Sequence, residues 1–236
     1  VALDERDALC LDGERLLPID PSVGGAATSG VEYRPEHDPT RRVLSYPGSV
    51  AGPARFEVYA GDGTIREYGG SGGQVVAPTT PTATAVSWLL RRVRDRRGNE
   101  WRIAYEVVPS GGDVAAEISE VIPVRIDYTA FHGEEGTAPA FARVELAYRE
   151  RPDPRAGYRF GFTTARTRLL ESITTWAADA PVLRYRFDHE RFGSDAVSRL
   201  VALEECSMEE EEEVCKPPTR FDWARPGEHD VDGEDQ

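Results

Sequence analysis

Three cysteines are the residues of this chain whose chemistry depends most on their spacing. Cys10, Cys206 and Cys215 form no Cys-x-x-Cys pair, and only four histidines accompany them. This set lacks the ligand spacing of a zinc or iron–sulfur site, so we expect neither a metal nor a cofactor. Cys206 and Cys215 flank an acidic segment, and they either form a disulfide in an oxidising compartment or remain two ordinary thiols. We expect Cys10 to be a small buried residue and not a nucleophile, because no histidine lies near it in the sequence.

Carboxylates could support hydrolysis, but their pattern is weak. A glycoside hydrolase needs two carboxylates that face each other across a cleft, and Asp127, Asp188 and Glu190 are available. In a chain with 42 acidic residues such sets arise by chance. The run Glu209–Glu213 could be a cation site or the Glu-x-Glu turn of an ADP-ribosyltransferase, yet it is more typical of a solvated loop. Gly69–Gly73 contains a serine but lacks the strand-to-helix context of a nucleophile elbow, so we expect no enzyme.

Aromatic side chains offer a third kind of site. Trp101 and Trp176 could belong to an exposed surface on which a sugar ring stacks. The same aromatic residues recur at a spacing of two, which favours packing between hairpins. The residues concerned are Trp88, Trp101, Tyr105, Trp176, Tyr185 and Trp223.

The elements that must position these residues are predicted to be strands. Short alternating runs are separated by Gly, Pro and Asp-Gly, and helical periodicity is nearly absent, which is typical of antiparallel sheet. We therefore predict an all-β protein in which hairpins extend a large curved sheet, with little or no helix. Further strands are predicted in Pro123–Ala130, Phe141–Arg151, Thr167–Trp176, Pro181–Arg191 and Arg199–Cys206.

Two hairpins are predicted most strongly. In Arg55–Gly69, Asp62 and Gly63 lie between alternating segments, and this dipeptide favours a type I′ turn with φ above zero at both positions. In Ser87–Val108 the turn holds Asp95, Gly98 and Asn99. We assign these five residues structural roles, because Gly and Asn tolerate φ above zero and Asp caps a turn through the backbone.

Charge limits the classes of partner. The chain has 28 Lys+Arg and 42 Asp+Glu, a net charge of −14, so we expect no nucleic-acid binding. No apolar run approaches the about 20 residues of a membrane span, and the first residues show no signal peptide. Most of the negative charge lies after residue 203, whereas the turn at residues 91–97 is rich in arginine and could form a local positive patch. We predict a domain over residues 1–223 and an acidic linker or disordered tail over residues 224–236.

The order of several motifs resembles a known family. The pattern Leu-x-x-Val-x-Asp-x-x-Gly-Asn, followed by a tyrosine, looks like a YD or RHS repeat. The wider chain resembles the N-terminal region shared by SpvB-type virulence proteins and the B component (TcB) of insecticidal toxin complexes. The stretches that carry this resemblance are Cys10–Ile19, Val31–Tyr46, Gly52–Gly69, Arg94–Glu106 and the ending Cys-x-Pro-Pro-Thr-x-Phe in Cys215–Trp223.

The resemblance implies a structural role. In toxin complexes a β-rich RHS shell encloses a toxic polypeptide, and this region is similar to part of it. Adjacent propeller and RHS repeats of the same large protein, and other toxin-complex components, are the implied partners, and the implied location is extracellular or secreted. We therefore expect a scaffold segment without chemistry of its own. The alternatives are a carbohydrate- or receptor-binding β-sandwich and, ranked lower, a glycoside hydrolase.

Overall fold

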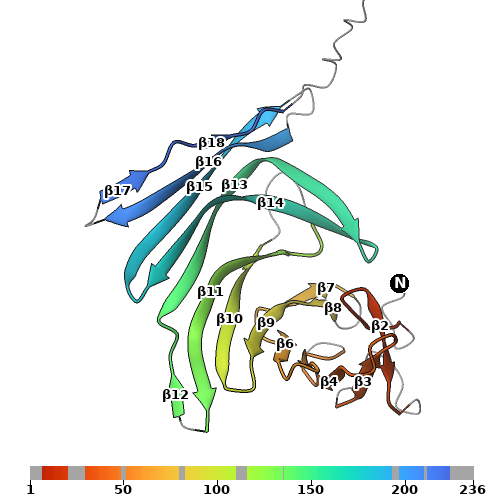
Figure 1. Ribbon diagram of the computed structural model, residues 1–236. Helices are drawn as coiled ribbons and strands as arrows, with labels where there is room; N and C mark the ends of the chain where they lie inside the picture. Colours follow the sequence, from red (N-terminus) through yellow and green to blue (C-terminus); the bar gives the residue numbers. More distant parts are fainter. Residues whose placement is uncertain are drawn as a thin grey trace, which may run out of the picture. The chain divides into compact units, whose positions relative to one another are not determined.

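A computed structural model describes residues 7–20, 30–48, 52–79, 83–109, 116–134, 136–192, 197–209 and 212–223. The predicted all-β class is confirmed, because the regular elements in these ranges are strands and none is a helix. Most strands belong to one antiparallel sheet of 16 strands, and β7 and β8 pair separately (Figure 1). The described residues include no helix of the length and apolarity that a membrane span requires.

The chain divides into two compact units. Unit 1 comprises residues 1–144 and 155–166, and unit 2 comprises residues 145–154 and 167–236. The long strands β13 (Ala142–Arg159) and β14 (Phe162–Ala177) contribute residues to both units. The predicted tail, residues 224–236, lies outside the described ranges.

Unit 1 contains most of the short strands. In chain order they are β1 (Cys10–Leu11), β2 (Glu14–Pro18), β3 (Glu32–Pro35), β4 (Arg42–Tyr46), β5 (Arg55–Tyr59), β6 (Ile65–Gly69), β7 (Gln74–Ala77), β8 (Thr84–Trp88), β9 (Leu90–Arg94), β10 (Asn99–Val108), β11 (Glu120–Gly133) and β12 (Gly136–Ala138). Alternation along these strands buries one cluster of side chains, formed by Leu9, Leu16, Val31, Tyr33, Val43, Phe56 and Val58. Because residues at a spacing of two share a face, this cluster is the core that the alternating pattern predicts.

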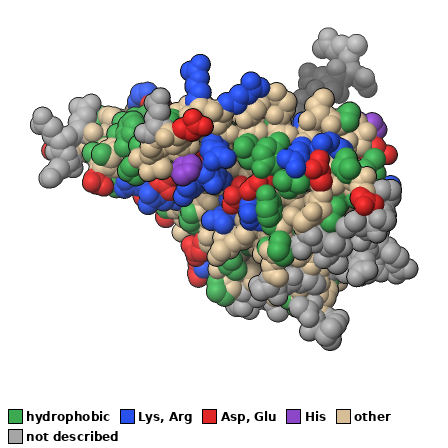
Figure 2. Space-filling view, turned by 90° about the horizontal axis from the view of Figure 1, so that it is seen from below, with side chains coloured by type: hydrophobic (Ala, Val, Ile, Leu, Met, Phe, Trp, Pro, Cys, Tyr) green, Lys and Arg blue, Asp and Glu red, His purple; other side chains and the backbone are tan. Residues whose placement is uncertain are grey.

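The other face of this sheet carries ion pairs and hydrogen bonds between charged and tyrosine side chains. The carboxylate of Glu57 accepts hydrogen bonds from the hydroxyls of Tyr46 (2.6 Å) and Tyr59 (2.8 Å), and it pairs with Arg55 at 2.7 Å. Further along, the carboxylate of Glu100, whose side chain is only 2% exposed, accepts a hydrogen bond from Arg92 Nε at 2.6 Å. Figure 2 shows such basic and acidic side chains intermingled on one surface of the molecule.

The hairpin turns correct one prediction. At residues 60–64 only Gly63 has positive φ (82°), so the predicted type I′ turn at Asp62-Gly63 is wrong. Gly63 N–H instead donates to Ala60 O (2.9 Å) and Ala60 N–H to Thr64 O (3.0 Å), which is a three-residue loop with a glycine bulge. Such a loop needs positive φ at the glycine alone.

Two of the loops in which two residues join paired strands have positive φ at both residues, as type I′ geometry requires. Asp12 (φ 53°) and Gly13 (φ 85°) link β1 to β2 in this way. Phe160 (φ 55°) and Gly161 (φ 87°) do the same between β13 and β14. The two-residue loop Ala178-Asp179 has positive φ at Ala178 alone (51°), so neither loop length nor the Asp-Gly pair decides the turn type by itself.

Unit 2 is built from long strands. These are the unit-2 parts of β13 (Ala142–Arg159) and β14 (Phe162–Ala177), followed by β15 (Ala180–Phe192), β16 (Val197–Glu209), β17 (Glu212–Cys215) and β18 (Thr219–Arg220). Both β17 and β18 pair with β16, one after the other, so a single segment follows that edge. We call Glu212–Trp223 the strap.

Candidate functional site

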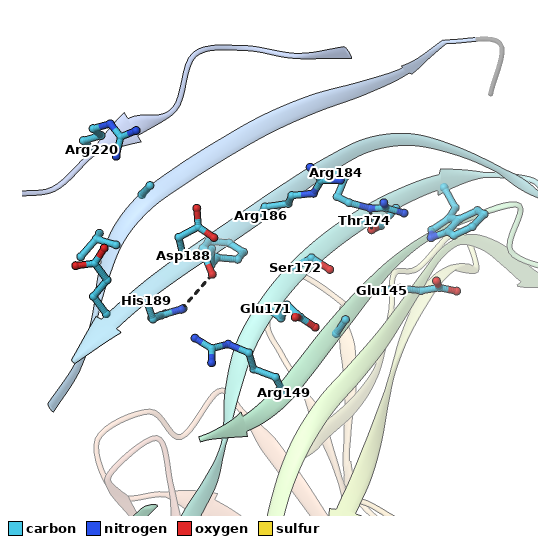
Figure 3. Close-up of a pocket in the computed structure, with 16 residues that line it drawn as sticks. Glu145, Arg149, Glu171, Ser172, Thr174, Arg184, Arg186, Asp188, His189 and Arg220 are labelled. Atoms are coloured by element: carbon cyan, nitrogen blue, oxygen red, sulfur yellow. Dashed lines mark hydrogen bonds between the residues drawn. The ribbon is translucent and has the colours of Figure 1, made fainter. Parts of the chain in front are cut away.

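A pocket of about 740 Å³ lies on one face of the unit-2 sheet (Figure 3). Its lining comes from β13, β14, β15, β16 and β18. This volume falls within the range of about 300–1,000 Å³ that ligand pockets occupy. Unit 2 therefore offers a concave surface large enough to hold a small molecule.

Strand register brings the polar lining together. Arg184 and Arg186 of β15 are opposite Thr174 and Ser172 of β14, so all four side chains share a face. Arg184 Nε donates to Thr174 Oγ1 at 3.2 Å, across the strand pair. On the next strand Ala202 is opposite both Asp188 and the strap residue Arg220, which completes this side of the pocket.

The four arginines of the pocket differ in their partners. Arg184 and Arg186 both pair with Glu213 of the strap, Arg184 at 3.5 Å, and Arg186 also pairs with Glu204 at 3.4 Å. Arg149 and Arg220 form no ion pair within the part of the chain that the structure describes. Counting only partners among the described residues, two guanidinium groups of this pocket are neutralised and two are not.

His189 supplies a neutral polar group. Burial lowers the pKa of its imidazole, and the nearby Arg149 and Arg151 lower it further, although the Phe187 carbonyl and Asp188 oppose this shift. His189 Nδ1 is 3.1 Å from the carbonyl oxygen of Phe187, an acceptor, so Nδ1 carries the proton. In the neutral ring Nε2 is then left as a hydrogen-bond acceptor.

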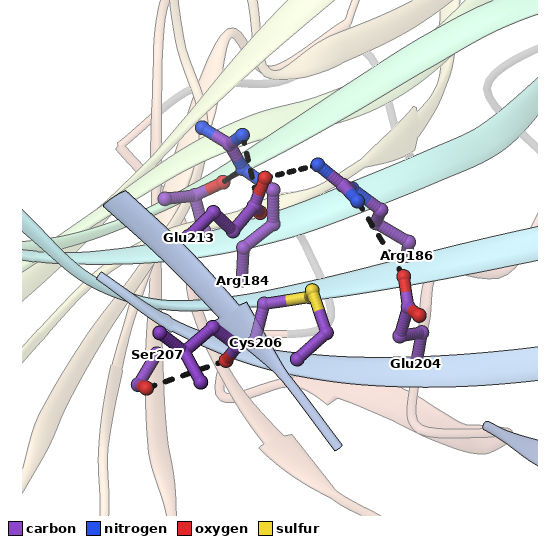
Figure 4. The surroundings of a disulfide bond; sticks show 9 residues. Arg184, Arg186, Glu204, Cys206, Ser207 and Glu213 are labelled. Carbon is purple, nitrogen blue, oxygen red and sulfur yellow. Dashed lines mark hydrogen bonds and ion pairs between the residues drawn. A yellow bond between two sulfur atoms is a disulfide. The ribbon is translucent and has the colours of Figure 1, made fainter. Parts of the chain in front are cut away.

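The cysteines lie beside this pocket. Cys206 and Cys215 are directly opposite each other on β16 and β17 and form a disulfide (Figure 4). Their sulfur atoms and the Glu204 carboxylate lie within 4.8 Å of one another, but the bonded sulfurs provide no thiolate for a metal ion. The disulfide therefore links the strap covalently to β16 of the sheet.

The structure corrects two predictions about reactive residues. Cys10 is exposed and not buried, because Leu9 on one side of it points into the core and strand alternation turns Cys10 outward. The Glu209–Glu213 run is not simply a solvated loop. Its Glu212 and Glu213 belong to β17, and Glu213 holds two arginines.

The candidate aromatic surface is divided between the two units. Trp176 lines the pocket, whereas Trp101 lies half-buried on β10 of unit 1, opposite Val93. Trp88 packs against Phe56 with the ring centroids 5.0 Å apart. Trp176 alone of the two candidate tryptophans is therefore placed to contact a ligand in the pocket.

The candidate carboxylates are also separated. Asp188 and Glu190 line the pocket, and Asp127 is on β11 of unit 1, where Arg125 Nε donates to it at 2.7 Å. Asp188 and Glu190 are nearly adjacent on one strand, so this pair does not face across a cleft as a glycosidase requires.

Four of the five predicted turn residues lie in hairpin turns, and Asn99 is the first residue of β10. Asp62 Oδ1 accepts from Thr64 N–H at 2.8 Å, and Asp95 Oδ1 accepts from Asn99 N–H at 2.9 Å. Gly98 has φ 93°, while Asn99 instead donates from its side-chain amide to Asp95 Oδ2 at 2.7 Å. Each aspartate thus closes its own loop, and these hydrogen bonds hold the pKa of both carboxyls below the usual range.

Sequence reasoning did not single out Arg149, Arg220 or His189. Each lies in a predicted strand or in the terminal motif, and arginine is too common here for one to stand out. Their shared face depends on register across strands that are far apart in the sequence. Alternation along Phe141–Arg151 and Pro181–Arg191 shows which residues of each strand share a face. It would identify Arg149 as a pocket residue only if the register between the strands were already known.

Comparison with known proteins defines the fold. No protein-family model and no curated protein matches the chain. The crystal structure of TcdB2-TccC3-Cdc42 matches with a TM-score of 0.68 and 18% identity, over 92% of this chain and 13% of that chain. The N-terminal domain of the effector protein SpvB from Salmonella typhimurium strain LT2 matches with a TM-score of 0.66 and 14% identity, over 88% of this chain and 83% of that one. This is an SpvB-like fold. The resemblance predicted from the sequence is thereby confirmed at the level of structure, and the chain spans about an eighth of the TcdB2-TccC3 chain, the 13% given above.

Proposed function

We propose that this chain is a scaffold segment of a secreted SpvB- or TcB-type protein and has no catalytic activity of its own. In this role it helps to enclose or present a toxic polypeptide. The SpvB-like fold extends over most of the chain, and one of its structural matches is a small part of a much longer toxin-complex chain. A segment of that kind works through its surfaces.

The observation that carries the proposal is the scarcity of buried side chains in unit 2. Among its described residues only Leu169, Thr174, Ala202 and Cys206 are buried, although β15 and β16 run for 13 residues each. A sheet that seals neither face as a core has both faces available for other protein. A sheet that separates an enclosed polypeptide from the surroundings would contact other protein on one or both faces in this way.

The two faces of this sheet differ in chemistry. On β15, Arg184 and Arg186 point to the pocket face, and Leu183 and Tyr185 alternate with them on the opposite face. Ile173 of β14 is opposite Tyr185 and extends the apolar face. The partners that we propose for these faces are adjacent propeller and RHS repeats of the same protein, with other toxin-complex components, in an extracellular setting.

Hydrogen exchange tests the proposal. The 236-residue chain alone is compared with the same chain as a segment of the full-length polypeptide that contains it. We expect the amides of β14–β16 to gain at least tenfold protection in the full-length protein, because neighbouring parts cover unit 2. The strands β4 and β5, which hold the unit-1 core, serve as the internal control and should change little. Equal protection of unit 2 in both forms would contradict the scaffold role.

A further inference from the structure

A scaffold does not require the polar lining of the unit-2 pocket. Arg149 and Arg220 line it, and within the described residues neither is neutralised by a carboxylate, unlike Arg184 and Arg186. Figure 3 shows Arg149 and His189 extending toward the same part of the pocket from different strands. Guanidinium groups present a planar fork of donors that matches a carboxylate. The pocket therefore has unused capacity for an anionic group.

The rest of the lining fits hydroxyl groups and a flat apolar surface. Trp176 supplies an indole, and Ser172, four residues earlier on β14, supplies a hydroxyl further along the pocket. Acceptors are provided by His189 and by the exposed carboxylates of Glu171 and Asp188. Sugar rings are bound by this combination, because an aromatic face contacts their C–H groups while carboxylates and imidazole accept from their hydroxyls.

The balance of charges selects among ligand classes. A phosphate-rich polyanion would be repelled by the carboxylates Glu171, Asp188 and Glu190, which also line the pocket. A neutral saccharide would leave Arg149 and Arg220 without a partner. We propose that this pocket binds a carboxylated saccharide, such as a glycan ending in sialic acid or a uronic acid. The carboxylate of the terminal sugar pairs with Arg149 beside His189, and a further ring of the same glycan, several strand residues along the pocket, contacts Trp176. Nothing in this proposal depends on the scaffold role.

Isothermal titration of the 236-residue chain with defined sugars tests the ligand class. The probes are 3′-sialyllactose and a tetrasaccharide that ends in glucuronic acid, with lactose as the neutral comparison. We expect at least one carboxylated probe to bind at least tenfold more tightly than lactose, since a charge-assisted hydrogen bond contributes about that factor. Equal affinity for lactose, or no binding of any of the three sugars at 10 mM, overturns the proposal.

Variants then locate the site. Arg149→Gln and Trp176→Ala are each expected to weaken binding of the carboxylated probe by about tenfold or more. Arg159→Gln, on the same strand but outside the pocket, and Trp101→Ala, in unit 1, are the matched controls and should bind as the unaltered chain does. Circular dichroism verifies that each variant is folded. Equal loss in the controls overturns the assignment of the pocket. An acidic peptide that binds more tightly than the sugars and depends on Arg149 overturns the saccharide class.

Discussion

Gly98 is a residue at which both backbone angle and space exclude a side chain. Its φ is 93°, and a Cβ would lie 2.5 Å from the His132 carbonyl oxygen. Gly98→Ala should therefore lower the free energy of unfolding by about 2 kcal/mol or more, measured by urea denaturation. Gly61→Ala is the matched control, because it also lies at a hairpin tip but has ordinary φ, and its nearest atom would be Thr40 Oγ1 at 3.9 Å. A similar loss in both variants would show that the angle and the close approach are not responsible.

Tyr46 links stability to alkaline pH. Burial and its hydrogen bond to Glu57 raise the pKa of this phenol to about 12, from 10.0. Because the folded-state pKa lies above the unfolded value, the stabilisation is fully present below pH 10 and is lost as pH rises toward 12. Tyr46→Phe should make the fall in melting temperature over this window shallower, and tyrosinate absorbance should report the missing titration. An unchanged slope would contradict this account.

At the scale of elements, alternation predicted where strands lie better than where they end. The predicted strand Phe141–Arg151 continues in the structure to Arg159, through Pro152, Pro154 and Gly157. Two prolines at a spacing of two remove donors that point to the same side, so the other side of the strand keeps its hydrogen bonds. The pocket could not be predicted in the same way, because its lining depends on the register of five strands and on the bulge between Asp188 and His189.

The strap is an element whose attachment can be tested. It is joined to β16 by the Cys206–Cys215 disulfide, by pairing of Thr219 with Leu203, and by Trp223 Nε1, which donates to Leu200 O at 2.7 Å. The disulfide closes a short loop, and a crosslink of this kind stabilises the folded state by about 2–3 kcal/mol. Reduction removes this contribution. Hydrogen exchange in the strap should therefore rise by about 10- to 100-fold under a phosphine reductant.

Two comparisons make that result specific. The strands β14 and β15 should keep their protection, because their pairing does not involve a cysteine. A Cys10→Ser variant should respond to the reductant as the unaltered chain does, since Cys10 is a free thiol in unit 1. Strap exchange that is unaffected by reduction would mean that pairing and ion pairs alone hold it.

At the scale of the whole molecule, the two units differ in what stabilises them. Unit 1 contains a contiguous buried cluster of seven side chains from Leu9 to Val58, whereas unit 2 buries four side chains among its described residues. Since burial of apolar surface is the main favourable term in folding, we expect unit 2 to unfold first. Thermal unfolding of the isolated chain should then deviate from two-state behaviour.

Tryptophan fluorescence can assign the transitions, because Trp176 and Trp223 lie in unit 2 and Trp88 and Trp101 lie in unit 1. The lower transition should appear in the unaltered chain and lose most of its fluorescence amplitude in the double variant Trp176→Phe, Trp223→Phe, while circular dichroism still records it. The apolar face that contains Leu183 and Tyr185 is only half-buried in the chain alone, so light scattering should also show self-association as this transition begins. A single sharp transition of a strictly monomeric chain, coincident by both probes, would mean that unit 2 is stable without a partner. That outcome would count against its role as an open wall of a larger assembly.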